Sequence, residues 1–394
     1  MNILSFLQLL RMIYGKKRLD LAKIQSMGLL AVKIGQVHAL RIDFLPREKC
    51  FELSKLYRAT IPIPSEDALM YVDKSVFRWI DERPLASASV GQVYRATLKD
   101  GSDVVIKVIK HHFKKEFERD VKSVKRLFRF IIFFYPKLSR VFDPIGILEH
   151  IEEYTLRELD LRNEIEGHET LQNIFLEYRD RYDLSFAAFP KIYKELSSEH
   201  IMVSEYIPGK TIDELLDKSL DYPILLRLFK THGIFMFVAG TFHGDIHPGN
   251  LMLYQEKLYF VDTGAIGHAS TKLRTGLLYF FDALSRYDYN LCAVRLNEMA
   301  EHALAGAEFD KFQQQFCAMY ADFKGSTIRQ VSLTQKMMDT IKLGVNAGMS
   351  FEKGMFSIIK SLMFLDGMVL RCNPNAKLME DMQPLLHEII GDKR

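Results

Sequence analysis

The alternation of apolar and polar positions predicts helices at both ends of the chain. From Leu19 to Leu40 the apolar residues recur near the helical period, and Pro46 ends this segment soon afterwards. We therefore predict a helical extension over residues 1–80. Helical periodicity returns over 114–178 and again beyond 208, where the predicted helices are rich in Met and Phe.

Short β-branched runs predict strand pairs between these helical regions. Lys99-Asp100-Gly101 is a turn signal between runs at 93–96 and 104–108, so these two runs should pair as a hairpin with Lys107 in mid-strand. Two further strand pairs are predicted, over 192–196 with 201–204 and over 251–253 with 258–261. The elements together predict an α+β fold with two lobes: a helical extension over 1–80, an N-lobe over 81–207 and a C-lobe over 208–394.

The composition is that of a globular protein. With 394 residues, of which 48% are hydrophobic, the chain can bury a large core. A formal net charge of only +3 predicts no nucleic-acid partner. The four cysteines are scattered without zinc-type spacing, which favours reduced thiols in the cytoplasm.

The apolar stretches predict neither a secretory signal nor a transmembrane segment. The longest, at 127–135 and 234–242, have about half of the roughly 20 residues that a spanning helix needs. At the N-terminus the basic residues follow the apolar run, and no small-residue cleavage site is present. We expect a cytoplasmic protein, although an amphipathic N-terminal helix leaves peripheral contact with a membrane open.

The densest cluster of chemical groups lies between the predicted helices of the C-lobe. His243 to Asn250 has the sequence HGDIHPGN, and after the predicted strand pair comes Val261-Asp262-Thr263-Gly264. This order of two carboxylates and an amide is typical of phosphoryl transfer, in which Asp245 would orient the acceptor while Asn250 and Asp262 bind Mg²⁺. The cluster predicts Mg-ATP binding in a protein-kinase-like cleft.

Several N-lobe residues complete this prediction. Lys107 is expected to neutralise the α and β phosphates, and Glu164 on a downstream helix is expected to hold that lysine. The hairpin before Lys107 should cover the phosphates, with small residues in place of a glycine-rich loop. The remaining predicted nucleotide contacts are Ala86, Ala88, Val90 and Gly91 in this loop and, near adenine, the backbone of Glu205 and Ile207.

Two other interpretations of the motifs are weaker. His243, Asp245 and His247 could belong to a transition-metal hydrolase, but the further His and Asn runs of such enzymes are missing, so His247 is expected to stabilise its loop by hydrogen bonding. Gly209-Lys210-Thr211 lacks the first glycine of a phosphate-binding loop and is interpreted as the turn and cap before the helix at 213–216.

Over residues 20–270 the chain resembles the UbiB/AarF (ADCK) family of atypical protein-kinase-like proteins. The resemblance rests on Lys33-Ile34-Gly35-Gln36 as the family's K-x-G-Q motif, on the alanine-rich loop 84–93, and on Glu158-Leu159-Asp160 as its E-x-D motif. It implies that Lys33 and Gln36 project near Glu158 and Asp160 and obstruct a protein substrate. It also implies ATPase activity linked to ubiquinone or isoprenoid lipid metabolism, with an unknown small-molecule or lipid acceptor.

The chain departs from the family pattern in two places. Thr263 replaces the Phe of Asp-Phe-Gly but leaves the metal ligand Asp262, and the C-terminal segment is amphipathic where ubiquinone-branch members often have hydrophobic membrane helices. Two alternatives stay open. One is a pseudokinase that binds ATP without chemistry, and the other is a phosphotransferase of the aminoglycoside or choline type, which shares the His-Gly-Asp loop but lacks the K-x-G-Q helix.

Overall fold

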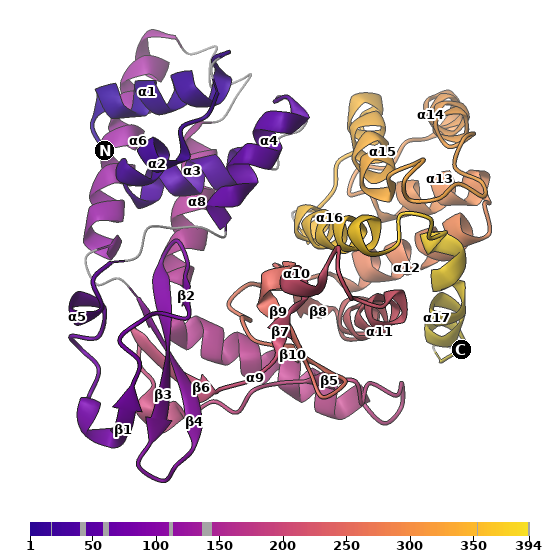
Figure 1. The fold of residues 1–394 in the computed structure, drawn as a ribbon. Helices are drawn as coiled ribbons and strands as arrows, with labels where there is room; N and C mark the ends of the chain where they lie inside the picture. The colour runs from indigo at the N-terminus through magenta and orange to yellow at the C-terminus, as the bar shows by residue number, and fades with distance from the viewer. Residues whose placement is uncertain are drawn as a thin grey trace. The chain divides into compact units, whose positions relative to one another are not determined.

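The computed structural model describes residues 1–16, 18–39, 45–57, 63–109, 113–135, 144–352 and 354–392. Their contacts form two compact units, and Figure 1 shows their elements. The first unit comprises Met1–Ile165 and Lys191–Tyr206, and the second comprises Glu166–Pro190 and Ile207–Arg394. The predicted extension thus shares one unit with the sheet, and the chain passes into the second unit twice.

The first unit contains a five-stranded antiparallel sheet in the order β1-β3-β4-β6, with β2 also paired to β3. The strands are β1 (Phe77–Ile80), β2 (Ala86–Ser87), β3 (Gly91–Leu98), β4 (Asp103–Ile109) and β6 (Ile201–Glu205). The predicted hairpin across Gly101, which has a φ of 91°, is confirmed. Alternate side chains of β3 and β4, such as Tyr94 and Ile106, are fully buried, which explains the register.

Two segments of this unit differ from the predicted secondary structure. β1 lies within the segment that was predicted to be helical. It was missed because its four residues are too few to show the two-residue period of a strand. The predicted strand 192–196 is a single bridge from Ile192 to Ser204 followed by a 3₁₀ turn, η3 (Lys194–Leu196). The regular strand partner of β6 is β4, and Met202 and Val203 of β6 are buried.

Helices of the first unit pack around a core of their own. Gly28, with a φ of 98°, separates two of them at a position where a continuous helix was predicted. The core contains Leu9, Leu30, Leu53 and Val121, all fully buried. The helices are α1 (Ile3–Tyr14), α2 (Leu21–Ser26), α3 (Leu29–Ala39), α4 (Arg47–Ser54), α5 (Ser65–Ala68), α6 (Phe113–Phe134), α8 (Pro144–Glu158) and the start of α9 (Leu161–Tyr178), with 3₁₀ turns η1 (Lys55–Tyr57) and η2 (Lys74–Val76).

The second unit is mainly helical, with two small sheets that carry the loop predicted to be catalytic. The sheets have the orders β5-β10-β9-β7 and β11-β8, and the predicted pairing of 251–253 with 258–261 is confirmed as β9 with β10. The strands are β5 (Ala187–Ala188), β7 (Lys210–Thr211), β8 (Thr241–His243), β9 (Leu251–Tyr254), β10 (Lys257–Phe260) and β11 (Ile266–His268). Thr211 caps the next helix through a capping box with Glu214, as the sequence predicts.

The helices of the second unit enclose an aromatic core that includes Phe235, Phe260, Phe280 and Phe316. A π-helical turn, η4 (Ile234–Ala239), ends at the left-handed Gly240 just before β8. The helices are α10 (Ile212–Leu215), α11 (Tyr222–Gly233), α12 (Thr271–Ser285), α13 (Tyr289–Met299), α14 (Gly306–Met319), α15 (Leu333–Ala347), α16 (Gly354–Cys372) and α17 (Leu378–Asp392), with a 3₁₀ turn η5 (Pro248–Asn250).

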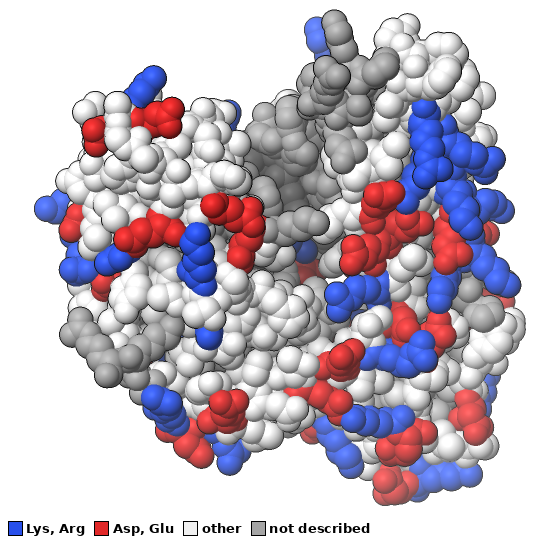
Figure 2. Space-filling model, turned by 180° about the vertical axis from the view of Figure 1, so that it is seen from behind, with Lys and Arg blue, Asp and Glu red and all other residues white. Residues whose placement is uncertain are grey.

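Surface charge is mixed, as the small net charge predicts. Figure 2 shows acidic and basic side chains interspersed over most of the face drawn, with Lys and Arg gathered at its upper right. None of the described helices is both long enough and apolar enough to cross a bilayer.

Candidate functional site

Lys107 and Glu164 form a buried ion pair in the first unit. Lys107 lies in the middle of β4, opposite Val93 on one side and Met202 on the other, and Glu164 lies in the first turn of α9. The Lys107 Nζ is 2.8 Å and 2.6 Å from the two carboxylate oxygens of Glu164. The two side chains are only 14% and 8% exposed, so the pair is largely shielded from water and each charge stabilises the other.

The loop predicted to cover phosphates is a tight hairpin between β2 and β3. The Ala88 N–H donates to the Gly91 carbonyl at 2.9 Å. A Cβ at Gly91 would lie 2.6 Å from the Val108 carbonyl, so this close approach of β3 to β4 requires glycine. Ala86 and Ala88 are exposed, whereas the Val90 side chain is buried in the helical core, so only the backbone of Val90 can meet a ligand.

The K-x-G-Q residues are buried on α3. Lys33 forms an ion pair with Glu158 at the end of α8, and its Nζ lies 5.7 Å from the centre of the Tyr154 ring. Gln36 donates from its amide to the Leu56 carbonyl at 3.0 Å. The structure therefore brings Lys33 to Glu158, while this bond of Gln36 ties α3 to the turn after α4.

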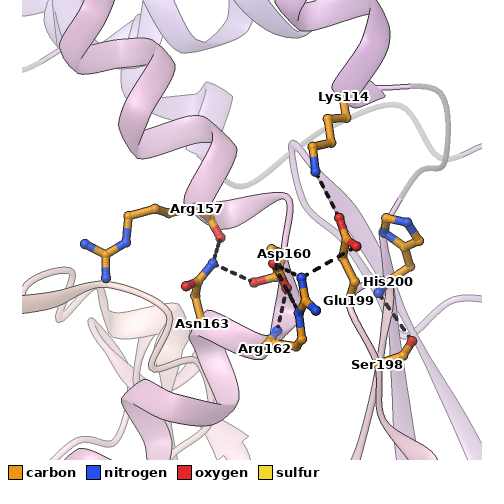
Figure 3. Close-up of polar contacts among 8 residues, drawn as sticks. All are labelled: Lys114, Arg157, Asp160, Arg162, Asn163, Ser198, Glu199 and His200. Carbon is orange, nitrogen blue, oxygen red and sulfur yellow. Dashed lines mark hydrogen bonds and ion pairs between the residues drawn. The ribbon is translucent and has the colours of Figure 1, made fainter.

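Asp160 holds the start of α9, as Figure 3 shows. Its carboxylate accepts from the Arg162 backbone N–H at 3.1 Å and from the Arg162 guanidinium at 2.7 Å and 2.9 Å. This side-chain hydrogen bonding with Arg162 lowers the pKa of Asp160 below its usual value. Arg162 and Lys114 both reach Glu199, at 3.6 Å and 2.9 Å, so the turn that presents Glu164 is held by a charged network.

Glu205 and Ile207, the predicted adenine contacts, lie on either side of the point where the chain leaves the first unit. The Glu205 N–H donates to the Lys191 carbonyl at 2.8 Å, and its carboxylate accepts from the Lys191 N–H at 3.1 Å. The Glu205 N–H is therefore hydrogen-bonded within the protein and is not available as a donor to adenine in this structure. The Ile207 side chain is buried.

The loop from His243 to Asn250 in the second unit is held by short-range hydrogen bonds. His243 donates from Nε2 to the Asp262 carbonyl at 2.6 Å, and its Nδ1 accepts from the Asp245 N–H at 3.2 Å. Burial lowers the pKa of His243, so its ring is neutral and this tautomer is consistent with both bonds. His247 accepts from the Gly249 N–H at 3.0 Å, which agrees with the loop-stabilising role predicted for it.

The donor set of this loop fits Mg²⁺. The Asn250 amide nitrogen donates to the Asp245 carbonyl at 2.9 Å, which leaves its amide oxygen for a cation, and Asp262 supplies a carboxylate. Magnesium prefers such oxygen ligands and takes the rest of its shell from phosphates and water. Among the described residues no group of three or more His, Cys, Asp or Glu side chains is arranged to hold a metal ion.

A model of the ABC1 atypical kinase-like domain matches residues 66–296, which include the Lys107–Glu164 pair and the His243 loop. The chain belongs to the ABC1 family. A probable protein kinase UbiB of Vibrio parahaemolyticus is 25% identical over 94% of this chain and 70% of its own length. The chloroplastic ACTIVITY OF BC1 COMPLEX KINASE 8 of Arabidopsis thaliana is 32% identical over 66% of this chain, but only 35% of that protein is covered.

A solved structure supports the kinase-like fold of this ABC1 protein. Rv3197 of Mycobacterium tuberculosis, in complex with erythromycin, has a TM-score of 0.56 and 18% identity, covering 98% of this chain and 96% of its own. The predicted two-lobed α+β kinase-like fold is thereby confirmed, as is membership of the UbiB group.

Two residues that the sequence analysis did not identify contact the loop motifs. The Lys360 Nζ on α16 lies 3.1 Å from the Asp245 Oδ1, although Lys360 is outside the region matched by the ABC1 model. A Cβ at Gly167 on α9 would lie 2.3 Å from the carbonyl of Thr263, the buried residue that replaces Phe after Asp262. No motif marks either residue, because a single Lys or Gly on a helix is common.

Proposed function

We propose that this ABC1 protein is an atypical kinase or ATPase that binds Mg-ATP and either hydrolyses it or transfers its γ-phosphoryl group. The observation that carries the proposal is the buried Lys107–Glu164 pair in a chain whose second unit also holds Asp245 and Asn250 on the His243 loop and Asp262 in the segment hydrogen-bonded to it. These are the residue types that kinases use to neutralise phosphates, bind magnesium and orient the acceptor.

In the proposed reaction each residue has a defined task. Lys107, oriented by Glu164, neutralises the α and β phosphates, while Asp245 orients the attacking water or hydroxyl. The nucleophile oxygen bonds to the γ phosphorus, the bond to the bridging oxygen breaks, and its electron pair leaves with ADP. The proton of the nucleophile passes to Asp245 or to the transferred phosphoryl group. Mg²⁺, held by Asn250 and Asp262, would neutralise charge on the phosphates.

Retention of Asp245 favours chemistry over the pseudokinase alternative. A protein that only binds ATP needs Lys107 and the metal ligands but has no need of a carboxylate that orients a nucleophile. The deciding experiment compares thermal unfolding with and without Mg-ATP, and then phosphate release, for the wild type and Asp262→Asn. A ligand at about 100 times its Kd stabilises by roughly 2.7 kcal/mol, so a magnesium-dependent rise in Tm that the variant lacks is expected.

Each outcome of this experiment has a clear meaning. A rise in Tm together with phosphate release supports the proposal, whereas a rise without phosphate release to water or to any acceptor supports the pseudokinase. No rise with any nucleotide would overturn ATP binding itself.

We also propose a small-molecule or lipid acceptor, or water, rather than a protein. The support is the buried Lys33–Glu158 pair of the K-x-G-Q and E-x-D motifs, whose family role is to obstruct protein substrates. Replacing Lys33 by Ala should change nucleotide preference or turnover. An aminoglycoside- or choline-type phosphotransferase would instead be insensitive to Lys33 and would phosphorylate one of those compounds in an acceptor screen.

A peripheral membrane contact is a second proposal, favoured by exposed apolar residues on two packed helices of the first unit. The end of α6 exposes Phe130, Phe133, Phe134 and Tyr135 close to Arg126 and Arg129, and α1 packs on α6 through Phe6 and Phe128. Aromatic and basic groups together suit an anionic bilayer. Replacing Phe133 and Phe134 by Ser should reduce sedimentation with phosphatidylglycerol vesicles, and Trp79→Ser, another exposed aromatic, should not.

A further inference from the structure

Lys360 is held against the proposed catalytic loop by its helix, α16. Its Nζ lies 3.1 Å from the Asp245 Oδ1, and the two side chains are 21% and 19% exposed. The same Nζ is 5.8 Å from the centre of the Phe364 ring, which in turn meets the His247 ring edge-on at 5.4 Å. One turn of α16 therefore contacts the loop at both Asp245 and His247.

The next residue on α16 fastens the helix to the same loop from the buried side. The Ser361 hydroxyl is 2.6 Å from the Nε2 of His232 on α11 and 3.5 Å from the His243 carbonyl. Ser361 and His232 are both buried. Because a packed helix with such anchors cannot slide freely, the position of Lys360 beside Asp245 is set by the core of the unit and not by a flexible surface contact.

The His243 loop contains no Lys or Arg of its own that could neutralise charge on a γ-phosphoryl group. Residues 241–256 include no Lys or Arg, although phosphoryl transfer concentrates negative charge on the γ-phosphoryl oxygens. A nucleophile bonded to Asp245 and aligned with the γ phosphorus places that phosphorus about 5–6 Å from the carboxylate, at hydrogen-bond and near-attack distances of roughly 3 Å each. The flexible four-carbon stem of a lysine beside Asp245 spans such a distance.

We propose that Lys360 is a catalytic cation that contacts the γ-phosphoryl group during transfer, supplied by a helix outside the region that the ABC1 model matches. The inference rests on the proposed function, because it assigns a further residue to the same reaction. Lys360 stays protonated throughout: it balances the charge on the γ-phosphoryl oxygens while the bond from the nucleophile forms and the bond to ADP breaks. Its contribution is electrostatic and largest in the transition state.

The test compares Lys360→Met and Lys360→Arg with Lys230→Met as a matched control. Lys230, on α11, also forms an ion pair in the second unit, 3.0 Å from Glu388, and has a similar side-chain exposure of 26%. Each protein is assayed for phosphate release and for the rise in Tm with Mg-ATP and with Mg-ADP, which lacks the γ-phosphoryl group.

We expect Lys360→Met to lose roughly 10²-fold in kcat, in line with the removal of one preorganised charge contact. Its stabilisation by Mg-ATP should fall while its stabilisation by Mg-ADP stays that of the wild type. Lys360→Arg should recover part of the activity, and Lys230→Met should behave as wild type in every assay.

Two results would overturn the role of Lys360 alone. One is wild-type turnover in Lys360→Met. The other is a lower Tm without nucleotide together with equal losses for ATP and ADP, which would make the ion pair merely structural. If instead the wild type neither binds Mg-ATP nor releases phosphate, the proposed function fails, and the assignment of Lys360 falls with it.

Discussion

The two regions that carry the proposed chemistry are held together in different ways. In the second unit, hydrogen bonds of the His243 loop join residues that are 2, 5 and 19 positions apart. In the first unit, Lys107 and Glu164 are 57 positions apart, and Lys33 and Glu158 are 125 apart. The loop geometry is thus encoded mostly in one short segment, whereas each lysine pair depends on the packing of a whole unit.

The difference also determines how each region should respond to mutation. The side chains proposed to bind Mg²⁺ are only partly buried, and their backbone is held by hydrogen bonds to residues nearby in the sequence. One of these side chains can therefore be removed with little effect on folding. The lysine pairs are largely buried charges, and removal of one partner takes away the opposite charge that stabilises the other in the interior. We therefore expect loop variants to lose activity and pair variants to lose stability.

The largest expected effect is the loss of turnover in Asp262→Ala. Because charge neutralisation supplies most of the catalysis in phosphoryl transfer, kcat should fall by at least about 10³-fold. The unfolding midpoint without nucleotide should change little. Asp322→Ala, which removes an exposed carboxylate paired with Lys336, is the control and should keep full activity. Wild-type turnover in Asp262→Ala would refute the proposed metal role.

Lys107→Met should have the largest effect on stability. It removes the cation that faces the buried Glu164 carboxylate, at an expected cost of about 3–5 kcal/mol in the free energy of unfolding. The double variant Lys107→Met with Glu164→Leu should recover much of this loss. Lys114→Met, which breaks an exposed pair with Glu199, should cost at most about 1 kcal/mol. Denaturant unfolding measures all three, and an additive double variant would contradict the buried-charge explanation.

Acid should destabilise the second unit through His168. Burial lowers the pKa of this side chain to about 4, and the ring packs edge-on against Phe189 at 5.5 Å. Between pH 6.5, the pKa of the unfolded state, and about pH 4, the unfolded chain binds a proton at His168 that the folded chain does not bind. The free energy of unfolding therefore decreases as the pH is lowered, by up to about 3 kcal/mol from this group. Urea unfolding at pH 7 and pH 5 should show a smaller difference in His168→Gln than in the wild type.

Gly167→Ala should cause a smaller loss of both stability and turnover, because it displaces the backbone next to Asp262. The added Cβ would meet the Thr263 carbonyl at 2.3 Å, so the segment after Asp262 must shift. Such overpacking costs roughly 1–3 kcal/mol and should also reduce turnover, because Asp262 is the preceding residue. Gly391→Ala, near the end of α17 with no neighbouring atom within 4 Å of the added Cβ, is the control for helix propensity. Equal turnover in the two variants would contradict this coupling.

Much of the fold could be predicted because its signals are local. The turn at Gly101, the capping box at Thr211 and the short strands around residue 255 each depend on a few neighbouring residues. β1 could not be predicted, because its own pattern is too short to establish a period, and the strand predicted at 192–196 proved to be a single bridge to Ser204. The candidate site divides similarly, since Asp245, Asn250 and Asp262 stand in two neighbouring motifs while no motif marks Lys360.

The amino-acid sequence by itself predicted the class of chemistry, because the types and order of the groups in the His243 loop are typical of few reactions. It also determined the strand of Lys107 through the turn and the β-branched run around it. Only the tertiary structure decided that Asp160 is held by Arg162 and that α16 brings Lys360 to Asp245. Contacts between distant segments depend on how whole helices and strands pack, and no local pattern of residues specifies that packing.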